Sequence, residues 1–368
     1  MSKHLRIWLF VILGTLLAST TLLAQGVITM TTSKRVGEKI SLSIEANGNV
    51  TIEGAKETGE TDDFGCKSYR LTSQTITIRG DVTTLDCFYN QLTSLDVSGC
   101  TALTELNCYN NQLTSLDVSG CTALETLTCF GNQLTSLDVS KNTALTTLYC
   151  SYNQLTSLDV SKNTALTELA CGYNKLTSLE VSKNTALTGL DCASIGLPSL
   201  DVSKNTALTT LYCSYNQLTS LDVSKNTALT TLYCSENQLT SLDVSKSTAL
   251  KMLSCHNNQL TSLDVSKNTA LEILGCDDNK LTSLNISGCA RLAVIRCSSN
   301  YIKGKAMTKL VNSLPNRRGK RSGTIFLVDR SSKKRDNNRC STADVTTARR
   351  KNWEVRQYKR SDWDCTLL

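Results

Sequence analysis

The feature that most constrains this chain is a 21-residue internal repeat that runs from Val82 to Ile302. Eleven copies of a unit close to LTxLxCxxNQLTSLDVSKNTA follow one another there. Asparagine recurs three residues after each cysteine and is missing only at Ile195. The cysteines keep the period without a gap: Cys87, Cys108, Cys129, Cys150, Cys171, Cys192, Cys213, Cys234, Cys255, Cys276 and Cys297. A fixed period of this length predicts a solenoid, because each unit can bury its apolar face only against its neighbours.

Each repeat is expected to contribute one short strand to a parallel sheet. In the second copy the recurrent apolar residues are Leu103, Leu106, Cys108, Leu113, Leu116 and Val118. The segment from Leu106 to Cys108 alternates inward and outward, so stacked copies predict strands roughly 4.8 Å apart. Asn111 is expected to hydrogen bond backbone groups in a tight turn. The LTSLDVS half predicts a second short extended segment on the opposite wall.

This pattern resembles the leucine-rich repeat, LxxLxLxxNxL. The 21-residue form with cysteine at an inward leucine position resembles the internalin J-like class of secreted bacterial proteins. The resemblance covers residues 82–302 and implies a solenoid with a parallel β-sheet on its concave face. It also implies a scaffold that binds partners, often in adhesion or host contact, without chemistry of its own. The sixth copy departs from the pattern at Ile195, Gly196 and Pro198, which predicts a local change of the backbone.

The residues on either side of the array predict two caps over its open ends. Alternation at residues 40–44 and 76–78 predicts strands in a small β-rich N-terminal cap, with a hairpin turn at Asn47-Gly48 and a return strand from residue 50. Beyond the array we expect an α/β cap. Its predicted elements are a helix at residues 306–311 ended by Pro315, a strand at 324–328, a helix at 343–351 capped by Ser341 or Thr342, and a strand at 353–358.

The first residues have the layout of a secretory signal peptide. Lys3 and Arg6 precede an apolar run from Ile7 to Leu17, and Ala24 stands at the expected cleavage site. No later segment approaches 18 apolar residues, so no integral membrane span is expected after removal of the signal. The predicted organisation is a signal peptide at 1–24, a β cap at 25–81, the repeat array at 82–302 and a basic cap and tail at 303–368. The protein is expected to be secreted or associated with the cell surface.

The net charge of +7 hides two unlike parts. Residues 303–368 carry 18 Lys and Arg against 6 Asp and Glu, a charge of +12, which leaves −5 for the remainder. A basic segment of this kind is either solvated surface or a site that tethers a polyanion.

The sequence allows three interpretations of the cysteine ladder: a metal site, a series of disulfides, or a column of buried free thiols. One inward thiol per repeat, with no histidine nearby, does not supply the converging ligands of a metal site. Regular stacking does not by itself give disulfide geometry, so buried free thiols are favoured. Cys100 and Cys121 lie one period apart and could bridge adjacent repeats, and Cys340 and Cys365 could bridge the tail. Cys66 and Cys289 have no evident partner.

Enzyme signatures are missing, so the chain is predicted to be non-enzymatic and to need no cofactor or metal. After the signal only His256 remains as a histidine, and it is expected to be a varied surface residue. There is no glycine-rich phosphate loop. Asp277 and Asp278 form an acidic pair expected to be exposed, which either attracts a cation or is solvated.

Aromatic residues concentrate at three outward positions of otherwise similar repeats. They are Phe88, Tyr89, Tyr109, Phe130, Tyr149, Tyr152, Tyr173, Tyr212, Tyr215 and Tyr233. Exposed aromatics on one face indicate an interaction surface, although duplication of one tyrosine-bearing unit would also explain them. We therefore predict recognition of a protein ligand, possibly on a host or cell surface, with glycan stacking on the tyrosines or polyanion tethering by the tail as alternatives. No nucleic acid partner is expected.

Overall fold

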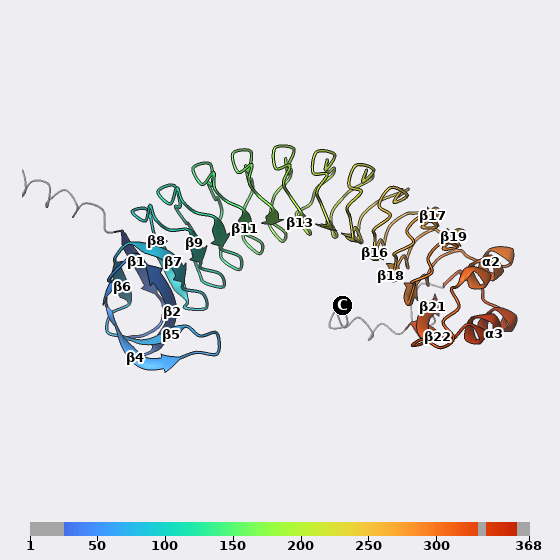
Figure 1. Cartoon of the computed structure of the whole chain (residues 1–368), viewed down its shortest axis with the longest axis horizontal. Helices are drawn as coiled ribbons and strands as arrows, with labels where there is room; N and C mark the ends of the chain where they lie inside the picture. Colours follow the sequence, from blue (N-terminus) through green and yellow to red (C-terminus); the bar gives the residue numbers. More distant parts are fainter. Residues whose placement is uncertain (1–25, 330–335, 359–368) are drawn as a thin grey trace, which may run out of the picture. The chain divides into compact units, whose positions relative to one another are not determined.

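The computed structural model describes residues 26–329 and 336–358 (Figure 1). The predicted signal peptide and Cys365 therefore lie outside the described residues. The chain divides into two compact units, residues 1–154 and 155–368, and this division falls inside the repeat array. Both units show the predicted leucine-rich repeat solenoid, with one short parallel strand from each repeat. The domain boundaries expected after residues 24, 81 and 302 stay predictions.

The N-terminal cap of the first unit is made of antiparallel strands, as predicted. They are β1 (Val27–Thr32), β2 (Lys39–Ala46), β3 (Thr51–Glu53), β4 (Ala55–Thr61), β5 (Lys67–Leu71) and β6 (Thr75–Arg79). One sheet has the order β3-β6-β1-β8, where β8 is Leu92–Asp96, and β4, β5 and β2 continue onto β7 (Val82–Asp86) of the first repeat. Because alternate residues of β1, β2 and β6 are fully buried, the cap covers the first repeat with apolar side chains such as Met30, Ile40 and Ile78.

The predicted hairpin across Asn47-Gly48 is wrong. The chain does turn there, with Gly48 at φ 113°. However, β2 pairs with β5 and β7, whereas β3 pairs with β6 of the other sheet. The turn therefore carries the chain between two sheets, because Ile52 pairs with Ile78 rather than with a residue of β2.

The repeats of the first unit contribute β7 (Val82–Asp86), β8 (Leu92–Asp96), β9 (Glu105–Asn107), β10 (Thr126–Thr128) and β11 (Thr147–Tyr149). Leu85, Leu106, Leu127 and Leu148 stand at the same strand position and are fully buried. The register between neighbouring strands places Leu106 opposite both Leu85 and Leu127. Strands β9, β10 and β11 are three residues long, and each ends at the residue before its cysteine.

The second unit continues the pattern in parallel strands. They are β12 (Glu168–Ala170), β13 (Gly189–Asp191), β14 (Thr210–Tyr212), β15 (Thr231–Tyr233), β16 (Met252–Ser254), β18 (Ile273–Gly275) and β20 (Val294–Arg296). On the opposite wall, the predicted second segment forms strands only at β17 (Ser262–Asp264) and β19 (Ser283–Asn285) in this unit. The other described copies of LTSLDVS in the unit are irregular but bury the same leucine and valine positions, apart from Leu179, which is half-buried.

The sixth repeat keeps the strand register despite its unusual sequence. Gly189 pairs with Glu168 and Thr210, as its counterparts do. Ile195 is buried at 3 % exposure in place of the asparagine. The predicted backbone change is confined to Gly196, which has φ 81° where most repeats carry a glutamine without positive φ.

The asparagine of each repeat has the structural role predicted for it. Asn237 donates from Nδ2 to the carbonyl oxygens of Cys213 at 3.0 Å and Cys234 at 3.2 Å. Its Oδ1 accepts from the amide of Leu218 at 3.0 Å. One buried asparagine side chain thus satisfies backbone groups of two successive repeats. These groups cannot hydrogen bond one another because they lie in tightly packed turns.

A second asparagine ladder runs along the loop that ends each repeat. Asn205 Nδ2 donates to the carbonyl oxygens of Val181 and Asn184, at 2.9 Å each. Cys100, Cys121 and Cys289 occupy this position in their repeats. The Cys121 thiol donates to the Val97 carbonyl at 3.3 Å, and the Cys289 thiol to Val265 at 3.1 Å. Each thiol thus replaces one of the two hydrogen bonds that an asparagine side chain donates at this position. Cys289 therefore has a structural role that the sequence did not indicate.

The cysteines of the ladder are buried, and none of them forms a disulfide within the described residues. Burial raises the pKa of the Cys234 thiol to about 12, and it raises the pKa values of Cys108 and Cys129 well above their ordinary value. Cys100 and Cys121 are also free thiols here, so a bridge between them stays a prediction, as does the one between Cys340 and Cys365. The ladder acts as a column of small apolar side chains, inert as nucleophiles because the thiolate is suppressed.

The C-terminal cap of the second unit has the four predicted elements. They are α2 (Lys305–Ser313), β21 (Gly323–Asp329), α3 (Thr342–Arg350) and β22 (Trp353–Tyr358). Strand β21 pairs in parallel with β20 and continues the sheet of the repeats. Ser341 caps α3 through a capping box with Asp344. Trp353 is buried and donates from Nε1 to the Pro315 carbonyl at 2.8 Å, which ties the cap together.

Candidate functional site

The candidate site is a pocket on the outward face of strands β14–β20, all within the second unit. Residues two apart in a strand face the same way, so the first and third strand residues of each repeat point outward. The third-position residues form one row in register: Asp191, Tyr212, Tyr233, Ser254, Gly275 and Arg296. Two tyrosines and an arginine thus flank the two smallest residues of the row.

The pocket exists because Ser254 and Gly275 leave space between Tyr233 and Arg296. Three strand spacings separate those two large residues, a span of roughly 14 Å. The pocket has a volume of about 330 Å³. Met252 and Ile273, at the first strand position, add apolar side chains to its lining. Size and composition suit a side chain or short extended segment of a partner rather than a solvated ion.

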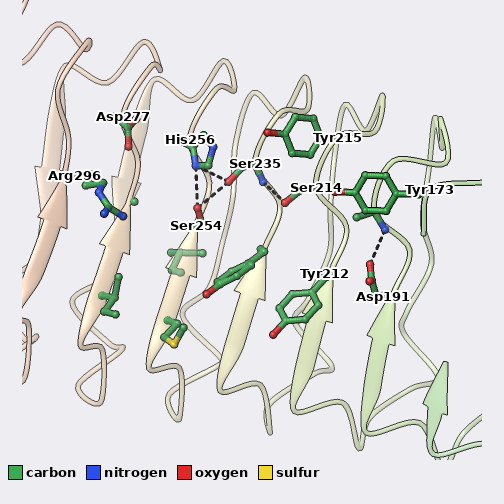
Figure 2. Close-up of a pocket in the computed structure, with 16 residues that line it drawn as sticks. Tyr173, Asp191, Tyr212, Ser214, Tyr215, Ser235, Ser254, His256, Asp277 and Arg296 are labelled. Atoms are coloured by element: carbon green, nitrogen blue, oxygen red, sulfur yellow. Dashed lines mark hydrogen bonds between the residues drawn. The ribbon is translucent and has the colours of Figure 1, made fainter. Parts of the chain in front are cut away.

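Polar groups gather along one side of the pocket, in the row that follows the cysteines. Figure 2 shows Ser235, Ser254 and His256 pointing toward one another. His256 Nδ1 lies 2.8 Å from Ser235 Oγ and 2.9 Å from Ser254 Oγ, and the two hydroxyls are 2.9 Å apart. This triangle orients the imidazole and presents hydroxyl groups to the pocket, so it can hydrogen bond a polar part of a ligand.

The imidazole of His256 is held neutral. Burial lowers its pKa, with a smaller contribution from the Arg296 cation, to about 4. The Arg296 guanidinium also lies over the Phe326 ring of β21, 5.8 Å from the centroid. None of the ion pairs among the described residues involves Arg296. Near neutral pH the pocket lining therefore contains one cation, Arg296, together with the acidic residues Asp191 and Asp277.

Lowering the pH is expected to destabilise the second unit through His256. Its folded pKa lies below the unfolded value near 6.5, so the unfolded chain binds the proton first and stability falls between about pH 6.5 and pH 4. After allowance for partial solvent screening, we expect a loss of about 1–2 kcal/mol.

The measurement is urea unfolding at steps between pH 7.5 and 4. Asp277 and Arg296 line the same pocket and are unchanged in a His256→Asn variant, which is the control. If the variant shows the same pH dependence across this window as the parent, another group is responsible.

The acidic pair at the end of the array is not the exposed feature that was expected. Asp277 lies in the pocket lining and is 2 % exposed, so that part of the prediction is wrong. Asp278 is half-buried and has φ 51° in the turn after the strand. Among residues 26–329 and 336–358, no group of three His, Cys, Asp or Glu side chains could hold a metal ion.

The structure divides the ten predicted aromatics between the two units. Tyr173, Tyr212, Tyr215 and Tyr233 lie around the pocket, and the first three of them are labelled in Figure 2. Tyr212 and Tyr233 contact each other with ring centroids 5.0 Å apart. The other six belong to the first unit: Phe88, Tyr89, Tyr109, Phe130, Tyr149 and Tyr152. The predicted binding role of these residues stays a proposal.

In the first unit three aromatic rings form a continuous stack. Tyr109 lies between Phe88 and Phe130, with both centroid distances at 4.6 Å and the planes within 9°. Phe64, from the turn between β4 and β5, packs edge-on against Phe88 at 5.5 Å. Phe88 is only 8 % exposed, so its expected exposure is wrong, whereas Phe64 is 69 % exposed. The stack therefore stabilises the junction between cap and first repeats.

Four tyrosines occupy a backbone position that disfavours them. Tyr89, Tyr152, Tyr173 and Tyr215 have φ between 54° and 57°, and their exposures range from 40 to 57 %. Gly131 and Asn110 fill the same position in other repeats at less conformational strain. A left-handed non-glycine residue costs about 1 kcal/mol, so an exposed tyrosine there is poorly explained by stability alone.

The sequence missed the residues that complete the pocket. Sequence reasoning predicts His256 to be varied surface and places Met252, Gly275 and Arg296 in no site. Their joint position follows from the 21-residue register, which puts residues one period apart on neighbouring strands. A departure from the consensus at the third strand position, such as Gly275, is the signal that could have found the hollow.

Comparisons with known proteins agree with this architecture. A family model described as leucine-rich repeats, two copies, matches residues 82–121, 101–142, 122–163, 143–184, 206–247 and 227–268. The functional domain of InlJ from Listeria monocytogenes, which includes a cysteine ladder, aligns at 40 % identity with a TM-score of 0.61. That alignment covers 65 % of this chain and 54 % of the InlJ domain, so the match spans about half of the relative's length. No curated protein sequence matches the chain.

Two more distant structures share the fold alone. An internalin of L. monocytogenes, InlF, aligns at 17 % identity with a TM-score of 0.59, covering 75 % of this chain and 87 % of its own. A leucine-rich repeat protein of Leptospira interrogans aligns at 20 % identity with a TM-score of 0.53, covering 74 % and 83 %. Among the described residues no helix has the length and apolar character needed to cross a membrane.

Proposed function

We propose that this leucine-rich repeat protein, whose repeats carry a cysteine ladder, is an exported, non-enzymatic protein that recognises another protein through the outward face of its strands. The observation that carries the proposal is the pocket between Tyr233 and Arg296. Its apolar lining and single cation suit an extended protein segment that carries an apolar side chain near an acidic group. Adhesion to a host or cell surface is the role we favour, in line with what the resemblance to the internalin J-like class implies.

The tyrosines support this function through their chemistry. Tyrosine contributes a large contact area at low entropic cost and is enriched where binding energy concentrates. Tyr173 and Tyr215 lie beside the pocket on exposed, left-handed turn positions, while Tyr212 and Tyr233 form its wall. A partner seated in the pocket would therefore cover all four rings.

Filling the hollow is the sharpest test of the pocket. Gly275→Tyr extends the natural row of Tyr212 and Tyr233, and a Cβ at residue 275 meets Ser254 Oγ at an ordinary 3.4 Å. We expect the variant to fold and to bind a protein partner at least tenfold more weakly, about 1.4 kcal/mol. Ala170→Tyr, at the same strand position but outside the pocket, is the matched control and should keep its affinity.

The measurement is biolayer interferometry of the full chain against a panel of cell-surface proteins and a glycan array. Protein binding that Gly275→Tyr removes and Ala170→Tyr preserves supports the proposal. Equal affinity of the two variants would exclude the pocket as the site. Binding confined to neutral glycans would favour the alternative, in which tyrosine rings stack on sugars.

A further inference from the structure

We infer that the C-terminal cap holds a second binding site, a basic cluster for a linear polysaccharide that carries sulfate or carboxylate groups. The cluster consists of two segments that the fold brings together, the loop after α2 and the end of α3. Its members are Arg317, Arg318, Lys320, Arg321, Arg349, Arg350 and Lys351. This site is separate from the pocket, because none of its residues lines that pocket.

Hydrogen bonds fix the two segments against each other. The amide of Arg317 donates to the Lys351 carbonyl at 2.9 Å, and Arg318 Nε donates to the Arg350 carbonyl at 2.7 Å. Asn352 Nδ2 donates to the carbonyls of Arg317 at 3.0 Å and Lys320 at 2.9 Å. The cationic segments are thus held at a defined separation rather than carried on a free tail.

The loop itself is a tight turn that projects its cations outward. The Lys320 amide donates to the Arg317 carbonyl at 3.0 Å, and Gly319 adopts φ 77° within the turn. A positive φ at this position is the geometry that glycine permits without strain. Arg318 and Lys320, on either side of the glycine, are both exposed.

Three cations of the cluster serve the fold, and four are available to a ligand. Arg318 is one of the three, through its hydrogen bond to the Arg350 carbonyl. Arg317 donates to the Leu292 carbonyl at 2.8 Å and lies over the Trp353 ring, 5.9 Å from its centroid. Lys351 donates to the carbonyls of Asn312 and Leu314. The side chains that are exposed and form no hydrogen bond or ion pair with the described residues are Lys320, Arg321, Arg349 and Arg350.

The acidic residues of the cap whose side chains are described do not neutralise the cluster. Asp344 is used at the other end of α3, where it closes the capping box and accepts from Thr308. Glu354 pairs with Arg356 at 2.9 Å. Asp336 accepts from the amide of Ser299 at 2.9 Å. The positive potential of the cluster is therefore left for an external anion.

The chemistry of the cluster favours an anionic polysaccharide over other polyanions. Arginine predominates, and its planar guanidinium binds sulfate and carboxylate groups with two parallel hydrogen bonds. The aromatic ring beside the cluster, Trp353, is 2 % exposed and offers no platform on which bases could stack. A linear sugar chain with repeated anionic groups needs only positive charges at intervals along its binding site, and the two basic segments supply them.

The test is retention of the full chain on immobilised heparin, with neutral dextran as the blank. The variant Lys320→Gln/Arg321→Gln/Arg349→Gln/Arg350→Gln removes the four available cations. The control Lys162→Gln/Lys183→Gln/Lys204→Gln/Lys225→Gln removes four exposed lysines from the repeats and has the same net charge. We expect the cluster variant to bind heparin at least tenfold more weakly, and the control to bind within threefold of the parent.

Equal weakening of the two variants would overturn the site, since retention would then depend on net charge alone. No retention of the parent above low salt would also overturn it. Single-stranded DNA is the competitor that tests the class of ligand. If DNA displaces the protein from immobilised heparin at a lower concentration of anionic groups than soluble heparin does, the proposal of a polysaccharide ligand is contradicted. Circular dichroism of each variant confirms that it is folded. A variant that loses heparin retention but still binds its protein partner separates this site from the pocket.

Discussion

Replacing Asn237 with alanine is expected to lower the free energy of unfolding by about 2–4 kcal/mol. Truncation removes the only side-chain acceptor of the Leu218 amide, at 3.0 Å, and leaves that buried donor unsatisfied. It also removes hydrogen bonds to the carbonyls of Cys213 and Cys234, although each of these still accepts from another asparagine, Asn216 and Asn258 respectively. The loss of unfolding free energy is thus dominated by the unsatisfied Leu218 N–H group and by the cavity left at residue 237.

The measurement is urea unfolding followed by far-ultraviolet circular dichroism. Gln238→Ala is the control, because Gln238 is adjacent, exposed and contributes its backbone amide to Leu218 rather than its side chain. The control should change stability by less than about 0.5 kcal/mol. Since solenoid stability is the sum of repeats and their interfaces, the Asn237 defect should weaken adjacent repeats as well. A loss no larger than that of Gln238→Ala would show that the ladder is not a principal support.

Gly120→Ala is expected to destabilise the first unit by about 2–3 kcal/mol. A Cβ built at Gly120 would lie 1.8 Å from the Ser98 carbonyl oxygen, a backbone atom that cannot move aside cheaply. Glycine precedes cysteine in each repeat that has cysteine in the second ladder, at residues 99, 120 and 288, whereas lysine precedes asparagine in most others. The loop therefore has two conformations, one suited to a thiol and one to an amide.

The pairing of residues makes a rescue experiment possible. Gly120→Lys/Cys121→Asn restores the sequence found at Lys141-Asn142, so the double variant should recover to within about 1 kcal/mol of the parent. Lys141→Ala is the matched control and should be nearly neutral. Thermal and urea unfolding of the four proteins would measure the coupling. If the double variant is as unstable as Gly120→Ala, the two loop conformations are not interchangeable.

Most of the architecture could be predicted from the repeat because each position occurs many times in the same context. Cysteine, leucine and asparagine return at one spacing, and a solenoid is the arrangement that buries all of them together. The four elements of the C-terminal cap were also predictable, since amphipathic periodicity, Pro315 and the Ser341 cap are local signals. The connection between β2 and β3, which joins two sheets, was not predictable, because strand partners are chosen by long-range apolar pairing such as Ile52 with Ile78.

The repeat geometry, the inward-facing residues and the variable outward positions follow from the amino-acid sequence alone. How those outward residues act together depends on the tertiary structure. The ten aromatics looked equivalent in sequence, yet Phe88 is buried in a stack while Tyr233 lines a pocket. Register explains the difference: residues far apart in sequence become neighbours across strands, so the hollow depends on Ser254 and Gly275 standing between Tyr233 and Arg296. A site made of gaps between large side chains has no signature of its own in a linear sequence.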